Sequence, residues 1–198
     1  QALEGCFARR DCPIWADSST GRDCRRLEVA LGGAAGVAEA TGSAAYCRFS
    51  GNQIARISRL EPEVYASSER VSLVSSFLTS VLAGKYCPID ASDASGMNLM
   101  DIRTQDWHEG ALAATGASGL REKLGPIAPS YHTVGRVSPF FVRKFGFSPS
   151  CVVAMGSGDN PCSIAGLGLT ADKGSVMVSL GTSDTVAAIT TSPLPQVE

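Results

Sequence analysis

The sequence lacks the features that would direct it to nucleic acid or to a membrane. It has no cluster of basic residues and its net charge is -2, whereas neutralising nucleic-acid phosphates requires clustered Lys and Arg. No apolar run reaches the roughly 18 to 20 residues that cross a bilayer, and the N-terminus has no basic region followed by a hydrophobic stretch. We therefore expect a soluble cytoplasmic protein with neither nucleic acid nor a membrane as a partner.

The seven cysteines contain no pair at the C-x-x-C spacing. Their odd number and scattered positions argue against a disulfide framework and against a structural zinc site. The two histidines, His108 and His132, have no nucleophile or metal-ligand set at usable spacing. The sequence therefore predicts no metal site, and most of the cysteines are expected to be buried small hydrophobic residues in a reducing compartment.

What the sequence does contain is ordinary globular material arranged in alternating helical and extended patterns. Hydrophobic residues make up 44% and charged residues 18% of the 198 residues, which is enough for a sizeable core. The apolar periodicity switches repeatedly between the helical and the extended type, so the pattern indicates a mixed α/β fold. The chain opens with Gln1 rather than Met and ends directly after a predicted hairpin, so we expect a piece of a longer protein.

The expected elements follow from apolar spacing, caps and glycine stops. In the first half of the chain we expect a helix that begins after the cap cluster 17–20 and ends at Gly32, a helix over 34–41, a helix through Ile54, Ile57 and Leu60, and a largely buried helix over 71–82. In the second half we expect a helix that carries Trp107 and is capped by Thr104, a helix that begins at Pro139, buries three phenylalanines and ends at Gly146, and a helix over 160–167. The strands expected are 12–15, the last part of the segment 89–100, which begins as a loop, and the pair 175–180 and 185–190. Residues 152–155 are expected to form a strand inside a sheet that is covered on both faces.

Two short motifs in the last third suggest phosphoryl transfer. The first, G-S-G-D-N-P over 156–161, places Asp159 after a predicted buried strand and between flexible glycines and a helix start. A carboxylate there could accept the proton of a sugar hydroxyl and aim its oxygen, with the glycines allowing close substrate approach. The second, S-L-G-T-S-D over 179–184, could cradle phosphate oxygens with backbone N–H groups and hydroxyls.

Each motif taken alone has an ordinary structural interpretation. Asp159 is equally compatible with a helix N-cap, and any short hairpin loop with a glycine looks like 179–184. Their combination favours a kinase.

Six strings in the same order carry a resemblance to a known family. The chain resembles the FGGY family of carbohydrate kinases, and within it the xylulose kinases of the animal type. The strings are I-W-A-D-S-S-T (14–20), Y-C-R-F-S-G-N-Q-I (46–54), S-L-V-S-S-F (72–77), D-A-S-D-A-S-G-M-N-L (90–99), G-D-N-P (158–161) and S-L-G-T-S-D (179–184).

The resemblance implies an incomplete two-domain kinase of the actin, hexokinase and heat-shock-chaperone type, which is an α/β, ribonuclease H-like ATPase fold. It implies that residues 1–172 are the later part of the N-terminal sugar-binding domain and that 173–198 are the opening hairpin of the C-terminal ATP-binding domain. Sugar and ATP would bind in a cleft near that junction. The segment that holds phosphate and Mg²⁺ would precede Gln1.

The resemblance also assigns roles to individual residues. Asp159 matches the catalytic base, Asn160 matches its neighbour on the sugar, and Arg48 matches a sugar-contacting arginine. A guanidinium can hold adjacent hydroxyls of an open-chain ketose, although Arg48 without the family would be interpreted as part of a surface ion pair. The residues matching the phosphate-binding turn that faces ATP are Gly181, Thr182 and Ser183.

Four further polar residues are left out of the predicted site. Asp17 is as easily a helix cap and Asp93 a carboxylate that braces a loop, and neither His108 nor His132 has a partner for catalysis.

The activity implied by the resemblance is ATP-dependent phosphorylation of D-xylulose to D-xylulose 5-phosphate, with Mg²⁺ as the ion that accompanies ATP. A chain without the other side of the cleft is expected to have little or no activity alone, because phosphoryl transfer needs groups from both sides. Another ketose, a polyol or glycerol stays open as the substrate, and so does a short product that binds sugar without catalysis. The oligomeric state is not predicted.

Overall fold

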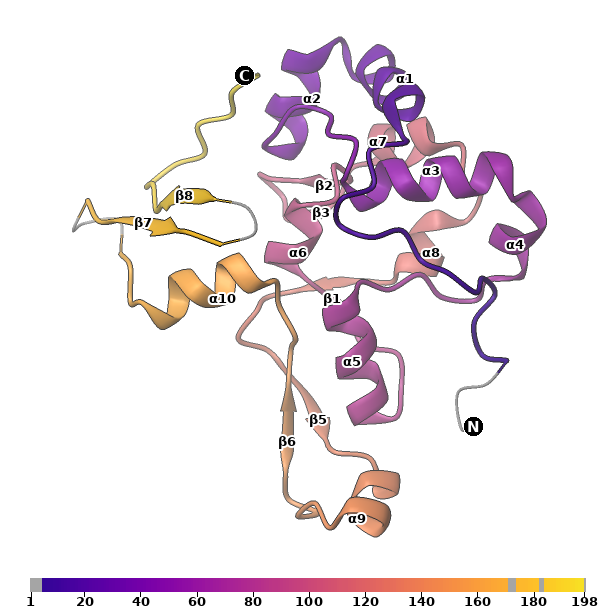
Figure 1. Cartoon of the computed structure of the whole chain (residues 1–198), viewed down its shortest axis with the longest axis vertical. Helices are drawn as coiled ribbons and strands as arrows, with labels where there is room; N and C mark the ends of the chain where they lie inside the picture. Colours follow the sequence, from indigo (N-terminus) through magenta and orange to yellow (C-terminus); the bar gives the residue numbers. More distant parts are fainter. Residues whose placement is uncertain (1–4, 171–173, 182–183, 198) are drawn as a thin grey trace.

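The computed structural model describes residues 5–170, 174–181 and 184–197. Its helices are α1 (Gly21–Leu31), α2 (Ala34–Thr41), α3 (Ser50–Leu60), α4 (Pro62–Ser67), α5 (Val74–Ala83), α6 (Ala91–Ser95), α7 (Glu109–Thr115), α8 (Leu120–Leu124), α9 (Pro139–Phe145) and α10 (Asp159–Gly166). Its strands are β1 (Ile89–Asp90), β2 (Met100–Asp101), β3 (Asp106–Trp107), β4 (Ile127–Ala128), β5 (Thr133–Arg136), β6 (Val152–Ala154), β7 (Val176–Ser179) and β8 (Thr185–Ala188). Figure 1 shows their arrangement.

The described strands pair two by two. β1 pairs with β4 in parallel, whereas β2 with β3, β5 with β6, and β7 with β8 are antiparallel. The predicted C-terminal hairpin is confirmed, with Ser179 opposite Thr185 in its register. The mixed α/β pattern that the periodicity indicated is therefore observed.

The apolar residues divide into two clusters. The larger one lies among the helices, with buried side chains from Leu27 on α1, Ile54 on α3 and Leu112 on α7. The smaller one lies between α5 and the β5/β6 pair and includes Cys87, Val134 and Val153. Figure 1 shows β5, β6 and α9 extending away from the helices around α1 and α3. The second cluster therefore joins this extension to the rest of the chain.

Glycines end several helices where the sequence predicted it. Gly32 ends α1 at φ 83°, Gly84 ends α5 at φ 69° and Gly146 ends α9 at φ 72°. These are left-handed backbone conformations that a residue with a Cβ adopts only at a cost. The helix stops could therefore be found from the sequence.

The strand expected over 12–15 is wrong. These residues form no strand, and the Ile14 side chain is 64% exposed. No described strand pairs with this segment, and an extended segment without a hydrogen-bonding partner is not a strand.

The segment 89–107 also differs from expectation. Asp90 ends β1 and its side chain accepts from the Asp93 N–H, so the predicted loop contains the short helix α6. Trp107 lies on strand β3, and His108, not Thr104, caps the following helix through its Nδ1 atom. Several side chains near a helix start can accept from its first N–H groups, and the tertiary contacts determine which of them becomes the cap.

The predictions of burial for α5 and α9 are wrong. Val74 on α5 is 83% exposed, and the helix buries the small polar residues Ser76 and Thr79 instead. No residue of α9 is fully buried, and Phe140 and Phe145 are exposed. Val152 on β6 is also exposed, so this strand is not covered on both faces within the described residues. Apolar periodicity identified the helices but not the face that the rest of the chain covers.

No described helix combines the length and the apolar character that a membrane span requires.

Candidate active site

The predicted catalytic carboxylate, Asp159, stands at the first position of α10. The loop 156–158 connects it to β6, as the sequence predicted. Both Asp159 and its neighbour Asn160 are exposed, and Asp159 Oδ1 accepts a 2.8 Å hydrogen bond from the Asn160 N–H. The carboxylate therefore stands at the positive end of a helix and is accessible to a small molecule.

Three successive residues of the preceding loop are held by side chains from other elements. The Gly156 N–H donates to Thr79 Oγ1 of α5 at 2.9 Å. The Ser157 hydroxyl donates to Asp90 Oδ2 at the end of β1 at 2.7 Å. Gly158 lies against the carboxylate of Asp93 on α6, since a Cβ built on it would lie 2.7 Å from Asp93 Oδ1. We call Thr79, Asp90 and Asp93 the loop clamp.

The two glycines of this loop allow it to pack closely against α5 and α6. A Cβ on Gly156 would lie 2.7 Å from the Ser75 carbonyl oxygen, and one on Gly158 would lie 2.7 Å from Asp93 Oδ1. Both distances are shorter than non-bonded contacts allow. The sequence explained these glycines by close substrate approach, whereas the structure gives them the additional role of letting the loop lie against α5 and α6.

The acidic residues around the loop have unequal environments. Burial raises the pKa of Asp93 above its ordinary value, and the nearby Asp90 and Asp159 add to this, while hydrogen bonds from Ser75 and the Gly158 N–H act in the opposite direction. Asp90 is 0% exposed, and its Oδ1 atom has no hydrogen-bond partner among the described residues. Asp93, which the sequence left out of the site, therefore lies next to Gly158, the residue before the predicted catalytic Asp159.

Arg48 occupies an aromatic environment. Its guanidinium carbon lies 5.4 Å from the centre of the Trp15 ring and 5.8 Å from that of Tyr46. The described residues contain no ion pair of Arg48, so the surface ion pair that was the ordinary interpretation is not seen. Aromatic faces attract a guanidinium and leave its N–H groups free at the edge to donate. The role of Trp15 was missed because Trp15 lies 33 positions before Arg48.

Buried amides fix the loop that carries Arg48. Asn98 Oδ1 accepts from the Tyr46 N–H at 3.2 Å, and Asn52 donates to the Tyr46 carbonyl oxygen at 3.0 Å. Both asparagines are buried. No hydrogen bond or ion pair joins Arg48 to Asp159 in the described part of the chain, so the two predicted sugar contacts do not touch each other directly.

The predicted phosphate-binding turn is described only in part. Gly181 follows β7, and its N–H donates to Asp184 Oδ1 at 3.3 Å. Thr182 and Ser183 lie outside the described residues.

The residues left out of the predicted site have local partners. Asp17 accepts from the Ser19 N–H at 2.7 Å, and His108 caps α7. His132 lies in the turn before β5, where its N–H donates to the Pro129 carbonyl oxygen. The described residues contain no group of three or more His, Cys, Asp or Glu that could hold a metal ion.

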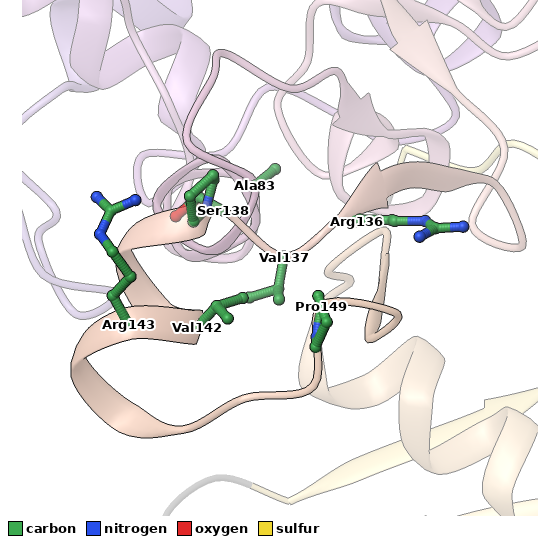
Figure 2. Close-up of a pocket in the computed structure, with 8 residues that line it drawn as sticks. Ala83, Arg136, Val137, Ser138, Val142, Arg143 and Pro149 are labelled. Carbon is green, nitrogen blue, oxygen red and sulfur yellow. The ribbon is translucent and has the colours of Figure 1, made fainter.

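A separate open cavity of about 430 Å³ lies beside α9 (Figure 2). Arg136, Val137, Val142 and Arg143 are among the residues that line it. The two guanidinium groups point away from each other, so they form no clamp for an anion (Figure 2). This cavity contains none of the predicted site residues.

Comparison with known proteins agrees with the resemblance found in the sequence. Residues 10–166 match the profile of the N-terminal domain of the FGGY family of carbohydrate kinases. The chain is 52% identical to xylulose kinase 2 of Arabidopsis thaliana and 50% identical to the xylulose kinase of Rattus norvegicus. Both alignments cover 100% of this chain, and they cover 35% and 36% of the two relatives. The chain thus spans about a third of the length of the curated relatives it matches.

The fold agrees as well. The crystal structure of a xylulose kinase from Brucella ovis superposes with a TM-score of 0.83 at 26% identity, over 96% of this chain and 37% of that one. The predicted fold class is confirmed: the chain forms part of the actin, hexokinase and heat-shock-chaperone type of ATPase fold.

Proposed function

The chain belongs to the FGGY family of carbohydrate kinases, and we propose that the enzyme containing it transfers the γ-phosphoryl group of ATP to D-xylulose. The products are D-xylulose 5-phosphate and ADP. The observation that carries the proposal is the exposed Asp159 carboxylate at the start of α10, on a loop hydrogen-bonded to α5 and β1 and packed against α6. The identities of 50% and 52% to xylulose kinases favour this sugar over another ketose, a polyol or glycerol.

In this mechanism the oxygen of the reacting sugar hydroxyl bonds to the γ-phosphorus, and Asp159 accepts the proton of that hydroxyl. The bond between that phosphorus and the bridging oxygen of ADP breaks at the same time. Asn160 hydrogen-bonds the sugar next to Asp159. Arg48, held over Trp15 and Tyr46, donates to neighbouring hydroxyls and orients the sugar.

We also propose the domain boundary between residues 172 and 173, which lies outside the described residues. The family match ends at residue 166, and the hairpin β7–β8 begins at Val176. Gly181, with Thr182 and Ser183, would then face ATP from the second domain. Mg²⁺ accompanies ATP in phosphoryl transfer, and the described residues contain no group of three or more His, Cys, Asp or Glu that could hold it without the phosphates.

A cytoplasmic location also stays a proposal. It is supported by the odd number of cysteines and the missing C-x-x-C pair, which argue against a disulfide framework. The expectation that most of the cysteines are buried is wrong, since only Cys24 and Cys87 are.

The test is ADP release by the whole enzyme with D-xylulose, L-ribulose and glycerol as acceptors. We expect turnover on D-xylulose, and a loss of at least a hundredfold in kcat for Asp159→Asn because the amide cannot accept the proton. Glu39→Gln, an exposed carboxylate on α2, is the matched control and should retain activity. Sugar binding without ADP release in the wild type would contradict the kinase assignment, and faster turnover on glycerol would contradict the substrate.

A further inference from the structure

We propose that Thr79, Asp90 and Asp93, the loop clamp, are positioning residues that fix the direction of the Asp159 carboxylate during phosphoryl transfer. This inference rests on the proposed function, in which Asp159 is the base.

The clamp contacts each of the three residues before Asp159 once. Gly156 is hydrogen-bonded to α5, Ser157 is hydrogen-bonded to the end of β1, and Gly158 packs against Asp93 of α6. Thr79 lies 77 positions before Gly156 in the sequence, and Asp90 lies 67 positions before Ser157. In a loop that served only as a connection, any partner, including water, could satisfy the backbone polar groups. Here the partners come from three different elements, so the position of the loop depends on all three.

The clamp residues are themselves held rigidly. Thr79 is buried, and its hydroxyl donates to the Ser75 carbonyl oxygen at 2.9 Å. Asp90 is buried and also accepts from the Asp93 N–H at 3.2 Å, which caps α6. The Asp93 carboxylate accepts from the Ser75 hydroxyl. Ser75 and Asp90 therefore link the three clamp residues into one network between α5 and α6.

Asp159 has no comparable support of its own. It is exposed, and the only hydrogen bond to its side chain among the described residues comes from the adjacent Asn160 N–H. The direction of its carboxylate therefore depends on the backbone of the loop 156–158. Misplacing a catalytic group by about 1 Å can cost roughly a hundredfold in rate, so the clamp should contribute to kcat without touching the sugar.

The experiment compares single variants of the whole enzyme. Thr79→Val keeps the shape of the side chain but leaves the Gly156 N–H without its acceptor. Asp93→Ala removes the carboxylate on which Gly158 packs and which accepts from Ser75, whereas Asp93→Asn keeps the shape of the side chain and one acceptor oxygen. Ser80→Ala is the control, because Ser80 lies on the same helix and its hydroxyl accepts from the Cys87 N–H at 3.0 Å, away from the loop.

We expect kcat on D-xylulose to fall about tenfold to a hundredfold in Thr79→Val and Asp93→Ala, with the KM for ATP unchanged. Asp93→Asn should recover most of the lost rate, and Ser80→Ala should keep the wild-type kcat. In the Asp159→Asn background, Thr79→Val should not lower kcat further, because the carboxylate that the loop clamp positions is already absent. Amide hydrogen exchange should accelerate at Gly156 in Thr79→Val but not in Ser80→Ala.

A drop in kcat of Ser80→Ala equal to that of Thr79→Val would overturn the inference, since general destabilisation would then explain both. So would an additive loss in the Asp159→Asn background, or unchanged exchange at Gly156. Failure of the proposed function gives a different result: the wild type would show no ADP release, or Asp159→Asn would be as active as the wild type, and both proposals would then be overturned.

Discussion

The Ser157 hydroxyl donates to Asp90 across 2.7 Å, and Asp90 is a side chain with 0% exposure. A fully buried carboxylate is costly unless it is hydrogen-bonded. Asp90 recovers part of this cost by bonding both Ser157 and the N–H at the start of α6 through one oxygen. Its second oxygen has no partner among the described residues. The residue therefore holds the candidate catalytic loop at some expense in stability.

Asp90→Asn should leave the free energy of unfolding within about 1 kcal/mol of the wild type. The amide oxygen can accept the two existing hydrogen bonds, and removing the buried charge offsets the unpaired NH₂ group. Asp90→Ala loses both bonds and should cost about 2–4 kcal/mol. Urea unfolding followed by tryptophan fluorescence measures both, and equal losses in the two variants would contradict this account.

Asp93 should make stability depend on pH in a defined direction. Burial raises its pKa in the folded state, so its stabilising contribution is present below the unfolded pKa of about 4 and is lost as the pH rises through the folded pKa. Asp93→Asn does not titrate. The melting temperature of this variant relative to the wild type should therefore increase between pH 4 and pH 7.

Asp101 provides a control with the opposite sign. Hydrogen bonds from the Arg103 and Thr104 backbone N–H groups lower its pKa, with the bond from Arg103 the stronger cause. Its contribution is present above the unfolded pKa and is lost as the pH falls. Asp101→Asn should lose stability relative to the wild type over the same rise in pH. Two variants with parallel profiles would refute the environments assigned to these carboxylates.

Arg48→Lys should raise the KM for D-xylulose about tenfold and change kcat less. Lysine keeps the charge but lacks the planar fork that donates to two hydroxyls and stacks on a ring. Trp15→Leu should act in the same direction but only a few-fold, because it removes a cation–π contact of about 0.5–1 kcal/mol. Arg25→Lys, exposed on α1, should have no effect. Unchanged sugar KM values in all three variants would remove Arg48 from the site.

Asp23 and Arg59 form the most buried ion pair of the described residues, with bonds of 3.2 and 2.9 Å and Asp23 only 3% exposed. Asp23→Ala should cost about 1–3 kcal/mol, less than for a fully buried pair because the Arg59 side chain reaches solvent. Glu39→Ala breaks the exposed pair with Arg103 and should cost below about 0.5 kcal/mol. Thermal unfolding of both variants would show whether burial makes this difference.

Cys24 should react slowly with alkylating reagents. Its burial raises the thiol pKa to about 11, so roughly one molecule in a thousand carries the reactive thiolate at pH 8. Cys162 on α10 is exposed and serves as the internal comparison. Mass spectrometry of the protein after timed treatment with iodoacetamide should show Cys162 modified well before Cys24. Equal rates at the two positions would contradict the buried environment.

Local chemistry explains which parts of the fold were predictable. The helix 34–41 and the stops at Gly32, Gly84 and Gly146 were found because a left-handed cap is a property of one residue and its neighbours. The hairpin β7–β8 was found because two short apolar runs flank a turn that contains a glycine. The strand over 12–15 was wrong because a strand exists only with a partner, which periodicity within one segment does not contain.

The candidate site follows the same division. Asp159 and Arg48 could be selected from short strings that resemble a known family, since those strings lie within a few residues of each chemical group. Asp93 and Trp15 also lie in such strings, over 90–99 and 14–20, but the strings do not show which groups these side chains contact. Asp93 packs against Gly158 and Trp15 lies against the Arg48 guanidinium, and these partners lie 65 and 33 positions away.

The sequence by itself thus determined the family, the α/β class and the identity of the candidate base, because these depend on residue types at fixed spacing. Only the tertiary structure decided what holds that base in place. Hydrogen bonds from Gly156 to Thr79 and from Ser157 to Asp90 join segments more than 60 residues apart. Their formation depends on how β1 and α5 pack together, and hydrogen-bond geometry tolerates only a few tenths of an ångström.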